Sequence, residues 1–381
     1  MRQLATIQEI TNLRKHPNAD TLDLVDIKGW EVITKTGDFE DGDKCIFFEI
    51  NSILPDYSPC FGFLSSRRYR IKTQKLRGIV SQGLCMPLSI LDVMRADKHL
   101  NGEVPELEIG ADLTEVLGVV KHDPEAQRES RQTERRNPSK NPLVEWLKQY
   151  AWFRKFHFNV VGSHTKNFPW FVRKTDETRV QNMQHFLRAH IGEEFYYMEK
   201  LDGQSFTAAI HKKKGFGILT KFFGTDFYVC SRNLTLYTKS DSNWWNIVIQ
   251  EDIENKLRGL STNIAIQGEI VGEGIQKNKY KLKGIHLYVF NIIDLDTQHY
   301  YTLEEREFLI RTHDLNWNTI PALGKIIMPE NSRPQDWVEI SKGNSKLNPK
   351  IRREGIVVRK LDDDKQSFKA INPDFLLKYG D

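Results

Sequence analysis

The first part of the chain alternates short apolar segments with turn residues. Partly alternating segments cover residues 22–27, 30–33 and 45–50. Glycine and aspartate gather between them, as in residues 40–43. Short strands at close spacing, separated by turn residues, are typical of a small barrel. The pattern therefore predicts a β-barrel domain over residues 1–120.

Residues 121–142 break this pattern. Ten of these 22 residues are charged and three are proline. A segment with so few apolar side chains cannot bury a core, so we expect an exposed and mobile linker. Apolar residues then recur at helical spacing from Leu143, which predicts a short amphipathic helix there.

The rest of the chain, residues 143–381, contains both helix-type and strand-type patterns of apolar residues. Helical spacing predicts helices at residues 181–190 and 303–311. Apolar segments bounded by turns predict strands at residues 195–198, 206–210, 264–271 and 286–293. We therefore expect an α+β protein, in which a barrel domain and a charged linker precede a mixed domain.

Composition narrows the environment and the partners. The four cysteines have neither zinc-type spacing nor a disulfide framework, so a reducing intracellular compartment is expected. The N-terminus lacks the features of a signal peptide, and no apolar run approaches the ~20 residues that span a bilayer. The formal net charge is only +4, so a nucleic-acid partner must be argued from a local cluster.

Such a basic cluster lies within the predicted barrel domain. Six arginines and lysines fall between residues 67 and 77, with Tyr69 among them. Basic side chains beside an aromatic ring suit a nucleic-acid backbone with a stacked base. A solvated charged loop is the alternative. The candidates for phosphate contacts are Arg70, Lys72, Lys75 and Arg77.

The tetrapeptide at residues 200–203 brings together a lysine amine, a carboxylate and a tight turn. A lysine at its ordinary pKa of ~10.4 is almost fully charged near neutral pH, so Lys200 must lose a proton before it attacks phosphorus. Burial or a nearby cation would lower that pKa, whereas Asp202 alone would raise it. A divalent cation would reverse the effect of Asp202. A surface turn is the alternative, because Asp-Gly is a common hairpin signal.

Further charged and aromatic residues follow downstream. Glu269 and Phe290 lie on predicted strands, and residues 354–359 combine an acid, a glycine, an apolar strand and a base. A basic segment with Lys369 and Lys378 comes last. Each residue alone has an ordinary interpretation as a strand-end acid, a core aromatic or a surface charge. At average residue frequencies, all of these motifs would rarely occur together by chance in one chain. Their joint occurrence therefore favours a catalytic role.

These motifs resemble those of the covalent nucleotidyltransferases, the superfamily of polynucleotide ligases and mRNA capping enzymes. The first, third, fourth and fifth motifs match residues 200–203, 288–292, 354–359 and 368 onward. A closer resemblance is to ATP-dependent RNA ligases of the fifth family, which carry an OB-fold before the catalytic domain. It rests on residues 174–182, 229–234 and 268–276, and on barrel segments 16–20 and 76–84.

Two departures from the superfamily pattern matter. No second barrel follows the fifth motif before Asp381, although DNA ligases and capping enzymes place one there. Ile371 stands where some RNA ligases have a second close lysine, so Lys378 becomes the candidate for that role.

The resemblance implies an OB-fold β-barrel followed by a ligase-type nucleotidyltransferase domain with antiparallel sheets and flanking helices. It also implies three transfers, in which Lys200 takes AMP from ATP, passes it to a 5′-phosphate, and a 3′-hydroxyl then displaces it. ATP and Mg²⁺ or Mn²⁺ would be the cofactors. The partner would be a nicked duplex with an RNA 3′-OH strand, bound by a monomer.

The resemblance further assigns roles to residues. The catalytic set would be Lys200, Asp202, Glu269, Glu354, Lys369 and Lys378. Its three acids would hold the metal through water, and Lys369 and Lys378 would face the phosphates. Phe290 would stack on adenine. The other nucleotide-binding candidates are Glu199, Arg179, Gly203, Arg232 and Val358.

Four other functions are alternatives to an RNA ligase. A GTP-using capping enzyme and a DNA ligase both lack support, because the second barrel is missing. A nucleic-acid-binding protein with an inactive ligase-like domain would require the loss of a catalytic lysine or acid. An interaction protein would require all the motifs to be accidental.

Overall fold

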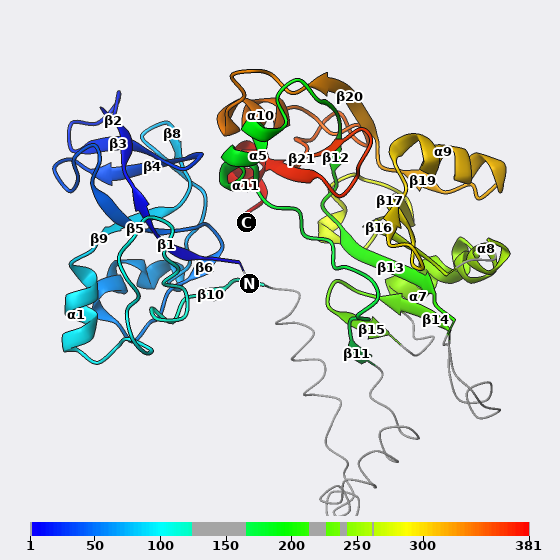
Figure 1. Ribbon diagram of the computed structural model, residues 1–381, viewed down its shortest axis with the longest axis horizontal. Helices are drawn as coiled ribbons and strands as arrows, with labels where there is room; N and C mark the ends of the chain where they lie inside the picture. The colour runs from blue at the N-terminus through cyan, green and yellow to red at the C-terminus, as the bar shows by residue number, and fades with distance from the viewer. Residues whose placement is uncertain (1, 124–164, 213–225, 237–241, 261–262, 381) are drawn as a thin grey trace, which may run out of the picture.

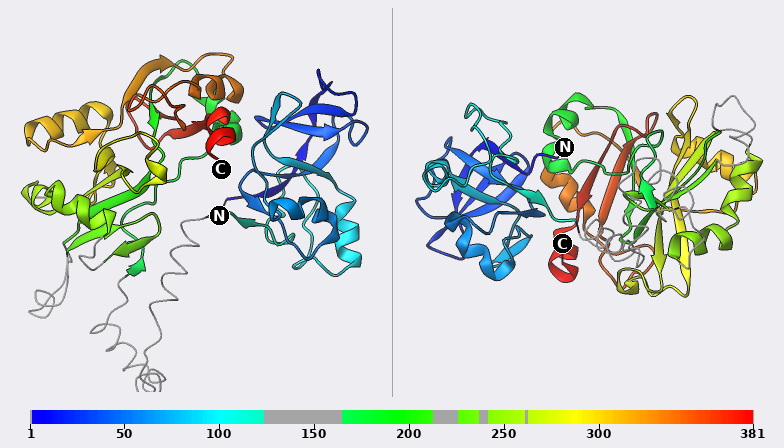
Figure 2. Two further views of the ribbon diagram at one scale, coloured as in Figure 1. Left: turned by 180° about the vertical axis from the view of Figure 1, so that it is seen from behind. Right: turned by 90° about the horizontal axis from the view of Figure 1, so that it is seen from below.

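The computed structural model describes residues 2–123, 165–212, 226–236, 242–260 and 263–380. The helix expected at Leu143 and the expected linker beyond Asp123 lie outside these ranges. The described residues form two lobes that lie side by side, with the C-terminal helix α11 (Pro373–Tyr379) at their junction (Figure 1, Figure 2).

The N-terminal lobe is a small barrel built from short antiparallel strands. Its four sheets are β1-β5-β9, β2-β3-β4, β6-β10 and β7-β8. The strands are β1 (Ala5–Glu9), β2 (Thr11–Lys15), β3 (Leu22–Ile27), β4 (Trp30–Lys35), β5 (Lys44–Phe48), β6 (Ser52–Ile53), β7 (Gln74–Leu76), β8 (Ile79–Ser81), β9 (Leu84–Pro87) and β10 (Val120–Lys121). The helices are η1 (Pro59–Arg67) and α1 (Ile90–Ala96). The predicted N-terminal β-barrel is confirmed.

The second lobe contains an eight-stranded and a four-stranded sheet, which are antiparallel except for the β17-β19 pair. The larger sheet contains β11 (Thr165–Asn167), β13 (Gln204–Ile210), β14 (Phe227–Cys230), β15 (Leu234–Leu236), β16 (Ile264–Gly272), β17 (Ile285–Asp294), β18 (His299–Tyr300) and β19 (Asn318–Thr319). The smaller sheet contains β12 (Glu194–Lys200), β20 (Ala322–Ile327), β21 (Gly355–Lys360) and β22 (Ser367–Ile371). The expected α+β class is confirmed.

Helices cover these sheets and bury apolar side chains against them. On the larger sheet, α7 contacts β14, β16 and β17, and Trp245 and Ile247 enter its core. On the smaller sheet, Trp337 of α10 packs against Phe368 of β22. The helices are η2 (Val180–Asn182), α5 (Gln184–Ala189), α7 (Asn243–Gln250), α8 (Ile253–Gly259), η3 (Gln276–Asn278), α9 (Leu303–Thr312) and α10 (Pro334–Ser341).

The helix expected at residues 181–190 is interrupted, and a contact between the lobes explains the break. The Gln181 carbonyl oxygen accepts the Gly29 N–H of the barrel at 3.0 Å. The Asn182 side chain accepts from Trp30 Nε1 at 3.0 Å and donates to Glu49 Oε1 at 2.6 Å. These partners lie across the junction, so η2 ends at Asn182 and α5 starts at Gln184.

The junction also changes the boundaries expected from the sequence. Lys121 belongs to β10, which pairs with β6, and the His122 N–H donates to the Asn51 carbonyl at 2.8 Å. The start of the expected linker is therefore part of the barrel. At the other end of the chain, Phe375 and Leu376 of α11 join the apolar cluster that forms the barrel core. In the part of the chain that the structure describes, no helix has the length and apolar character needed to cross a membrane.

Candidate active site

Lys200 is the last residue of β12, and strand pairing sets its neighbour. In the register of β12 with β21, Lys200 lies opposite Gly355, so Glu354 stands directly beside the lysine. The Lys200 Nζ donates to both carboxylate oxygens of Glu354 at 2.7 Å. This pairing brings the first and fourth motifs of the sequence into one site.

The turn after Lys200 is held against the larger sheet. The Gly203 N–H donates to Glu269 Oε1 of β16 at 3.0 Å, and the Asp202 N–H donates to the Tyr280 hydroxyl at 2.7 Å. A side chain at Gly203 could not fit, because a Cβ there would lie 2.3 Å from the Ile270 carbonyl oxygen. The glycine allows the close approach that brings the two sheets together behind the lysine.

A pocket of about 260 Å³ opens above this turn, between the two sheets. Such a concave space with convergent polar groups is the usual form of a small-molecule site. Its lining includes most of the residues predicted to act in catalysis or nucleotide binding, namely Glu199, Lys200, Asp202, Gly203, Arg232, Glu269, Phe290, Glu354 and Lys369. Residues more than 150 positions apart thus converge on one cavity, and an accidental set of motifs does not explain this.

Lys369 of β22 forms the basic side of the pocket with Arg232. The Lys369 Nζ donates to Asp176 Oδ1 at 2.8 Å, and Arg232 Nη2 lies 3.7 Å from Asp176 Oδ2. Burial lowers the pKa of Lys369 to about 8; Asp176 opposes this shift, and the charge of Arg179 adds to it. Burial would raise the pKa of Asp176, but Lys369 and the other cations hold it well below its usual range.

Lys200 has the opposite electrostatic environment. Burial disfavours its charge, but the carboxylates of Glu354, Glu269 and Asp202 outweigh burial and raise its pKa. Without a nucleotide or a metal, the amine is therefore protonated and cannot act as a nucleophile. The sequence-based expectation of a lowered pKa thus depends on a further cation.

The three acids were tested as candidates for holding that cation. Carboxylate oxygens are the ligands that Mg²⁺ and Mn²⁺ prefer, and Asp202, Glu269 and Glu354 all line the pocket. Among the described residues, no three histidine, cysteine or acidic side chains converge closely enough to hold a metal directly. Magnesium usually keeps several waters, so the spacing fits contacts through water.

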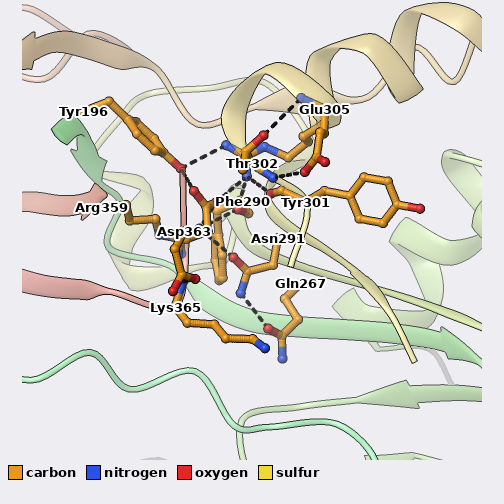
Figure 3. Close-up of polar contacts among 12 residues, drawn as sticks. Tyr196, Gln267, Phe290, Asn291, Tyr301, Thr302, Glu305, Arg359, Asp363 and Lys365 are labelled. Atoms are coloured by element: carbon orange, nitrogen blue, oxygen red, sulfur yellow. Dashed lines mark hydrogen bonds and ion pairs between the residues drawn. The ribbon is translucent and has the colours of Figure 1, made fainter. Parts of the chain in front are cut away.

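Phe290 of β17 is held in the pocket by Arg359 of β21 (Figure 3). The Arg359 Nη1 donates to the Phe290 carbonyl oxygen at 2.9 Å and to Asn291 Oδ1 at 2.6 Å, and its guanidinium lies 5.8 Å from the Phe290 ring centre. Asn291 in turn donates to Gln267 at 2.7 Å. These contacts fix the position of a half-buried ring that lines the pocket, and a planar base could stack on such a ring.

Val358 and Lys378 do not line the pocket, and strand geometry explains the position of Val358. Side chains alternate along β21, so Val357 lines the pocket while Val358 faces the opposite side and is fully buried in the core. Lys378 lies on α11, with its Nζ 5.3 Å from the Tyr379 ring centre. It does not line the pocket, so its predicted role at the phosphates stays a prediction.

Arg179 and Arg70 also lie elsewhere than expected. Arg179 is buried beside Lys369, and its guanidinium lies 5.8 Å from the Trp30 ring at the junction of the lobes, outside the pocket lining. Arg70 is buried within the barrel and donates to Asn51 at 2.8 Å, so it is a structural arginine. The other candidates for phosphate contacts, Lys72, Lys75 and Arg77, are exposed.

Several residues of the site were missed by sequence reasoning. Asp176 and Arg359 occur in segments that carried the family resemblance, but neither was given a role there. Tyr280 and Lys279 lie on a polar loop without a motif. The Tyr280 hydroxyl accepts the Asp202 N–H, and the Lys279 ammonium contacts the Asp202 carboxylate. Nothing in the local sequence distinguishes this lysine from its neighbours.

The pocket combines a lysine among carboxylates, a basic side formed by Lys369 and Arg232, and an aromatic ring. These are the groups that a covalent nucleotidyltransferase requires, and here a barrel precedes them in the chain. Comparison with known proteins supports this class. The family models match an OB-fold domain at residues 4–88 and RNA ligase at residues 193–371. The two matches occur in the order found in RNA ligases that carry an OB-fold domain before the nucleotidyltransferase domain, and the chain is similar to these proteins.

Solved structures similar to this chain come from the RNA ligase of Naegleria gruberi. An apo mutant has a TM-score of 0.78 at 28% identity, with 99% of each chain covered. The complex with pyrophosphate has a TM-score of 0.77 at 29% identity, and a mutant with AMP and Mn has 0.78 at 29% identity, again with 99% of both chains covered. A search of curated proteins finds no match.

Proposed function

We propose that this RNA ligase uses ATP to seal 3′-OH/5′-phosphate nicks and favours an RNA strand at the 3′ end. The observation that carries the proposal is the position of Lys200, which bonds to Glu354 and lines one pocket with Lys369 and Arg232. The similar ligase of Naegleria gruberi was crystallised with ATP and Mn and with AMP and Mn, which supports ATP as the nucleotide.

Three balanced transfers account for the reaction. The neutral Lys200 amine attacks the α-phosphorus of ATP, an N–P bond forms and pyrophosphate leaves. The 5′-phosphate of the nick then attacks the same phosphorus, so the N–P bond breaks and AMP caps the strand. A 3′-hydroxyl attacks that capped phosphate, a phosphodiester forms and AMP leaves.

The chain's side chains orient and stabilise these steps. Lys369 and Arg232 provide positive charge on the wall, where phosphate oxygens gain negative charge. Phe290 stacks on adenine, with Val357 beside it, and Glu199 lies near the nucleoside. Asp202, Glu269 and Glu354 would hold Mg²⁺ or Mn²⁺, and the ion would supply positive charge that favours a neutral Lys200.

The first test is covalent labelling with ATP that carries a labelled α-phosphate, in the presence of Mn²⁺. The protein should form an adduct with AMP that is sensitive to acid, as a phosphoramidate is, and Lys200→Ala should form none. Lys325→Ala, an exposed lysine of β20 outside the pocket lining, serves as a control. An absence of any nucleotide adduct would exclude the ligase mechanism, and labelling by GTP alone would favour a capping reaction.

The second test compares strands. Nicked duplexes that differ only in a ribose or deoxyribose at the 3′-OH end should be sealed at different rates, the RNA end faster, because the 2′-hydroxyl distinguishes RNA from DNA. Equal rates on both ends would remove the preference and leave lysine adenylylation intact.

The third test concerns the barrel. Replacing Lys72, Lys75 and Arg77 with alanine should weaken binding to a nicked duplex and reduce the salt dependence of binding. With fewer phosphate contacts, binding releases fewer counterions from the duplex. Lysine adenylylation should not change. Lys98→Ala, an exposed lysine after α1, is the matched control. Unchanged duplex binding by the triple variant would place the nucleic acid elsewhere.

A further inference from the structure

A lysine outside the sequence motifs contacts the proposed metal site. Lys279 lies on the loop after η3, and its Nζ forms an ion pair with Asp202 Oδ2. Its side chain is only 14% exposed, whereas Lys277, Lys281 and Lys283 of the same loop are exposed. One of four neighbouring lysines is therefore turned inward, toward a carboxylate of the K-x-D-G turn.

Two aromatic rings fix the position of Lys279. Its Nζ lies 4.9 Å from the Phe375 ring centre and 5.2 Å from the Tyr379 ring centre, and these two rings are 4.8 Å apart. Both rings belong to α11, where Phe375 is anchored in the apolar cluster of the barrel core. A cation held over aromatic faces keeps its charge in a partly buried place.

The loop also ties the catalytic turn by two neutral bonds. Tyr280 accepts the Asp202 N–H at 2.7 Å, and Gln276 Nε2 donates to the Gly203 carbonyl at 3.3 Å. These bonds hold the turn in place without any charge. The ion pair with Lys279 is thus not needed to fix the turn, and its distinctive effect is on the charge of Asp202.

We infer that Lys279 is a built-in counter-ion of Asp202 that competes with the divalent cation for this carboxylate. Asp202, Glu269 and Glu354 together form an acidic cluster around Lys200, and a cation on one member lowers the negative potential available to the metal. Metal binding at Asp202 then requires Lys279 to give up its ion pair. The inference rests on the proposed assignment of Asp202 to the metal site.

The test is Mn²⁺ binding to the nucleotide-free protein, followed by electron paramagnetic resonance of the free ion. Lys279→Met removes the charge and keeps the length of the side chain, so Mn²⁺ should bind about tenfold more tightly. Lys279→Arg should bind as the wild type does. Lys281→Met, on the exposed side of the loop, is the matched control and should change binding less than twofold.

A double-mutant cycle shows whether the effect passes through Asp202. Asp202→Asn should weaken Mn²⁺ binding, and Lys279→Met should have no effect in that background. If Asp202→Asn leaves Mn²⁺ binding unchanged, the metal assignment fails. If Asp202→Asn weakens binding but Lys279→Met alone leaves it unchanged or weaker, the counter-ion inference fails by itself.

A second variant covers the case in which Lys279→Met does not fold. Tyr379→Leu removes one ring beneath the ammonium group and leaves the ion pair, so about a threefold gain in Mn²⁺ affinity is expected. The concentration of Mn²⁺ that half-saturates lysine adenylylation should fall in parallel. A loss of Mn²⁺ affinity in Tyr379→Leu would overturn the inference.

Discussion

Lys200 and Lys369 lie in one pocket, yet their surroundings shift their pKa values in opposite directions. Their side chains have similar exposure, 28% for Lys200 and 16% for Lys369. Burial disfavours charge on both, but the pKa of Lys200 rises and that of Lys369 falls to about 8. Burial alone therefore does not set the charge of a lysine in this site.

The difference comes from the neighbours of each amine. Three carboxylates act on Lys200, whereas Lys369 has one close carboxylate, Asp176, and feels the cation of Arg179. The resting protein thus keeps its proposed nucleophile charged and unreactive. The lysine proposed to face the phosphates titrates closer to neutral pH. The variants below each change either Lys200 or the surroundings and charge of Lys369.

The largest effect is expected from Lys200→Arg. The guanidinium keeps a cation beside Glu354, so the free energy of unfolding should change by less than about 1 kcal/mol. Arginine remains protonated in proteins and cannot attack phosphorus, so no AMP adduct should form. Labelling with ATP and thermal unfolding measure the two quantities. A labelled arginine variant would mean that another residue is the nucleophile.

Lys369→Met should reduce adenylylation by about 100-fold in kcat/KM for ATP, the usual cost of removing one fixed charge from developing negative charge. The adduct at Lys200 should still form slowly. Lys378→Met is the matched control, because Lys378 lies on α11 outside the pocket lining, and it should change the rate less than twofold. A larger loss at Lys378 than at Lys369 would restore the role that the sequence assigned to it.

The pH dependence tests the Lys369 side directly. A group whose pKa is about 8 is charged below that pH and neutral above it. Arginine stays charged throughout, so the kcat/KM of the wild type relative to Lys369→Arg should be constant below pH 8 and fall about tenfold per pH unit above it. The ratio cancels the titration of Lys200, which both proteins share. A constant ratio up to pH 9.5 would show that the charge of Lys369 is not required.

Much of this site could be predicted from the sequence because strand pairing brings its motifs together. Antiparallel pairing of β12 with β21 places Glu354 beside Lys200, and pairing of β13 with β16 brings Glu269 to the turn. Val358 was assigned to the pocket, but its neighbour Val357 lies there. Successive side chains of a strand point to opposite faces, so a shift of one residue exchanges a pocket position for a core position. The alternation of β21 alone does not tell which face borders a nucleotide.

The remaining residues depend on contacts that no local pattern encodes. Lys378 lies outside the pocket lining, and Lys279 pairs with Asp202 beside the rings of α11. Both positions depend on the packing of α11 on the barrel core, which a sequence motif cannot show. Arg70 looked like its exposed neighbours but is buried, because its guanidinium binds Asn51 on the same barrel. The split of the helix at residues 181–190 likewise follows from bonds to Gly29 and Trp30 across the junction.

The smallest effect is expected from Asp176→Asn, which removes the charge of the carboxylate that bonds to Lys369. Asp176 holds Lys369 at 2.8 Å and raises its pKa against burial, so its loss should lower that pKa further. The bend in the pH profile of kcat/KM should then move about one unit toward acid, and the rate should fall severalfold at pH 8 but little at pH 6. Glu339→Gln, which removes an exposed acid from α10, should leave the bend in place. An unmoved bend in Asp176→Asn, or a shift toward alkali, would show that Asp176 does not favour the charge of Lys369.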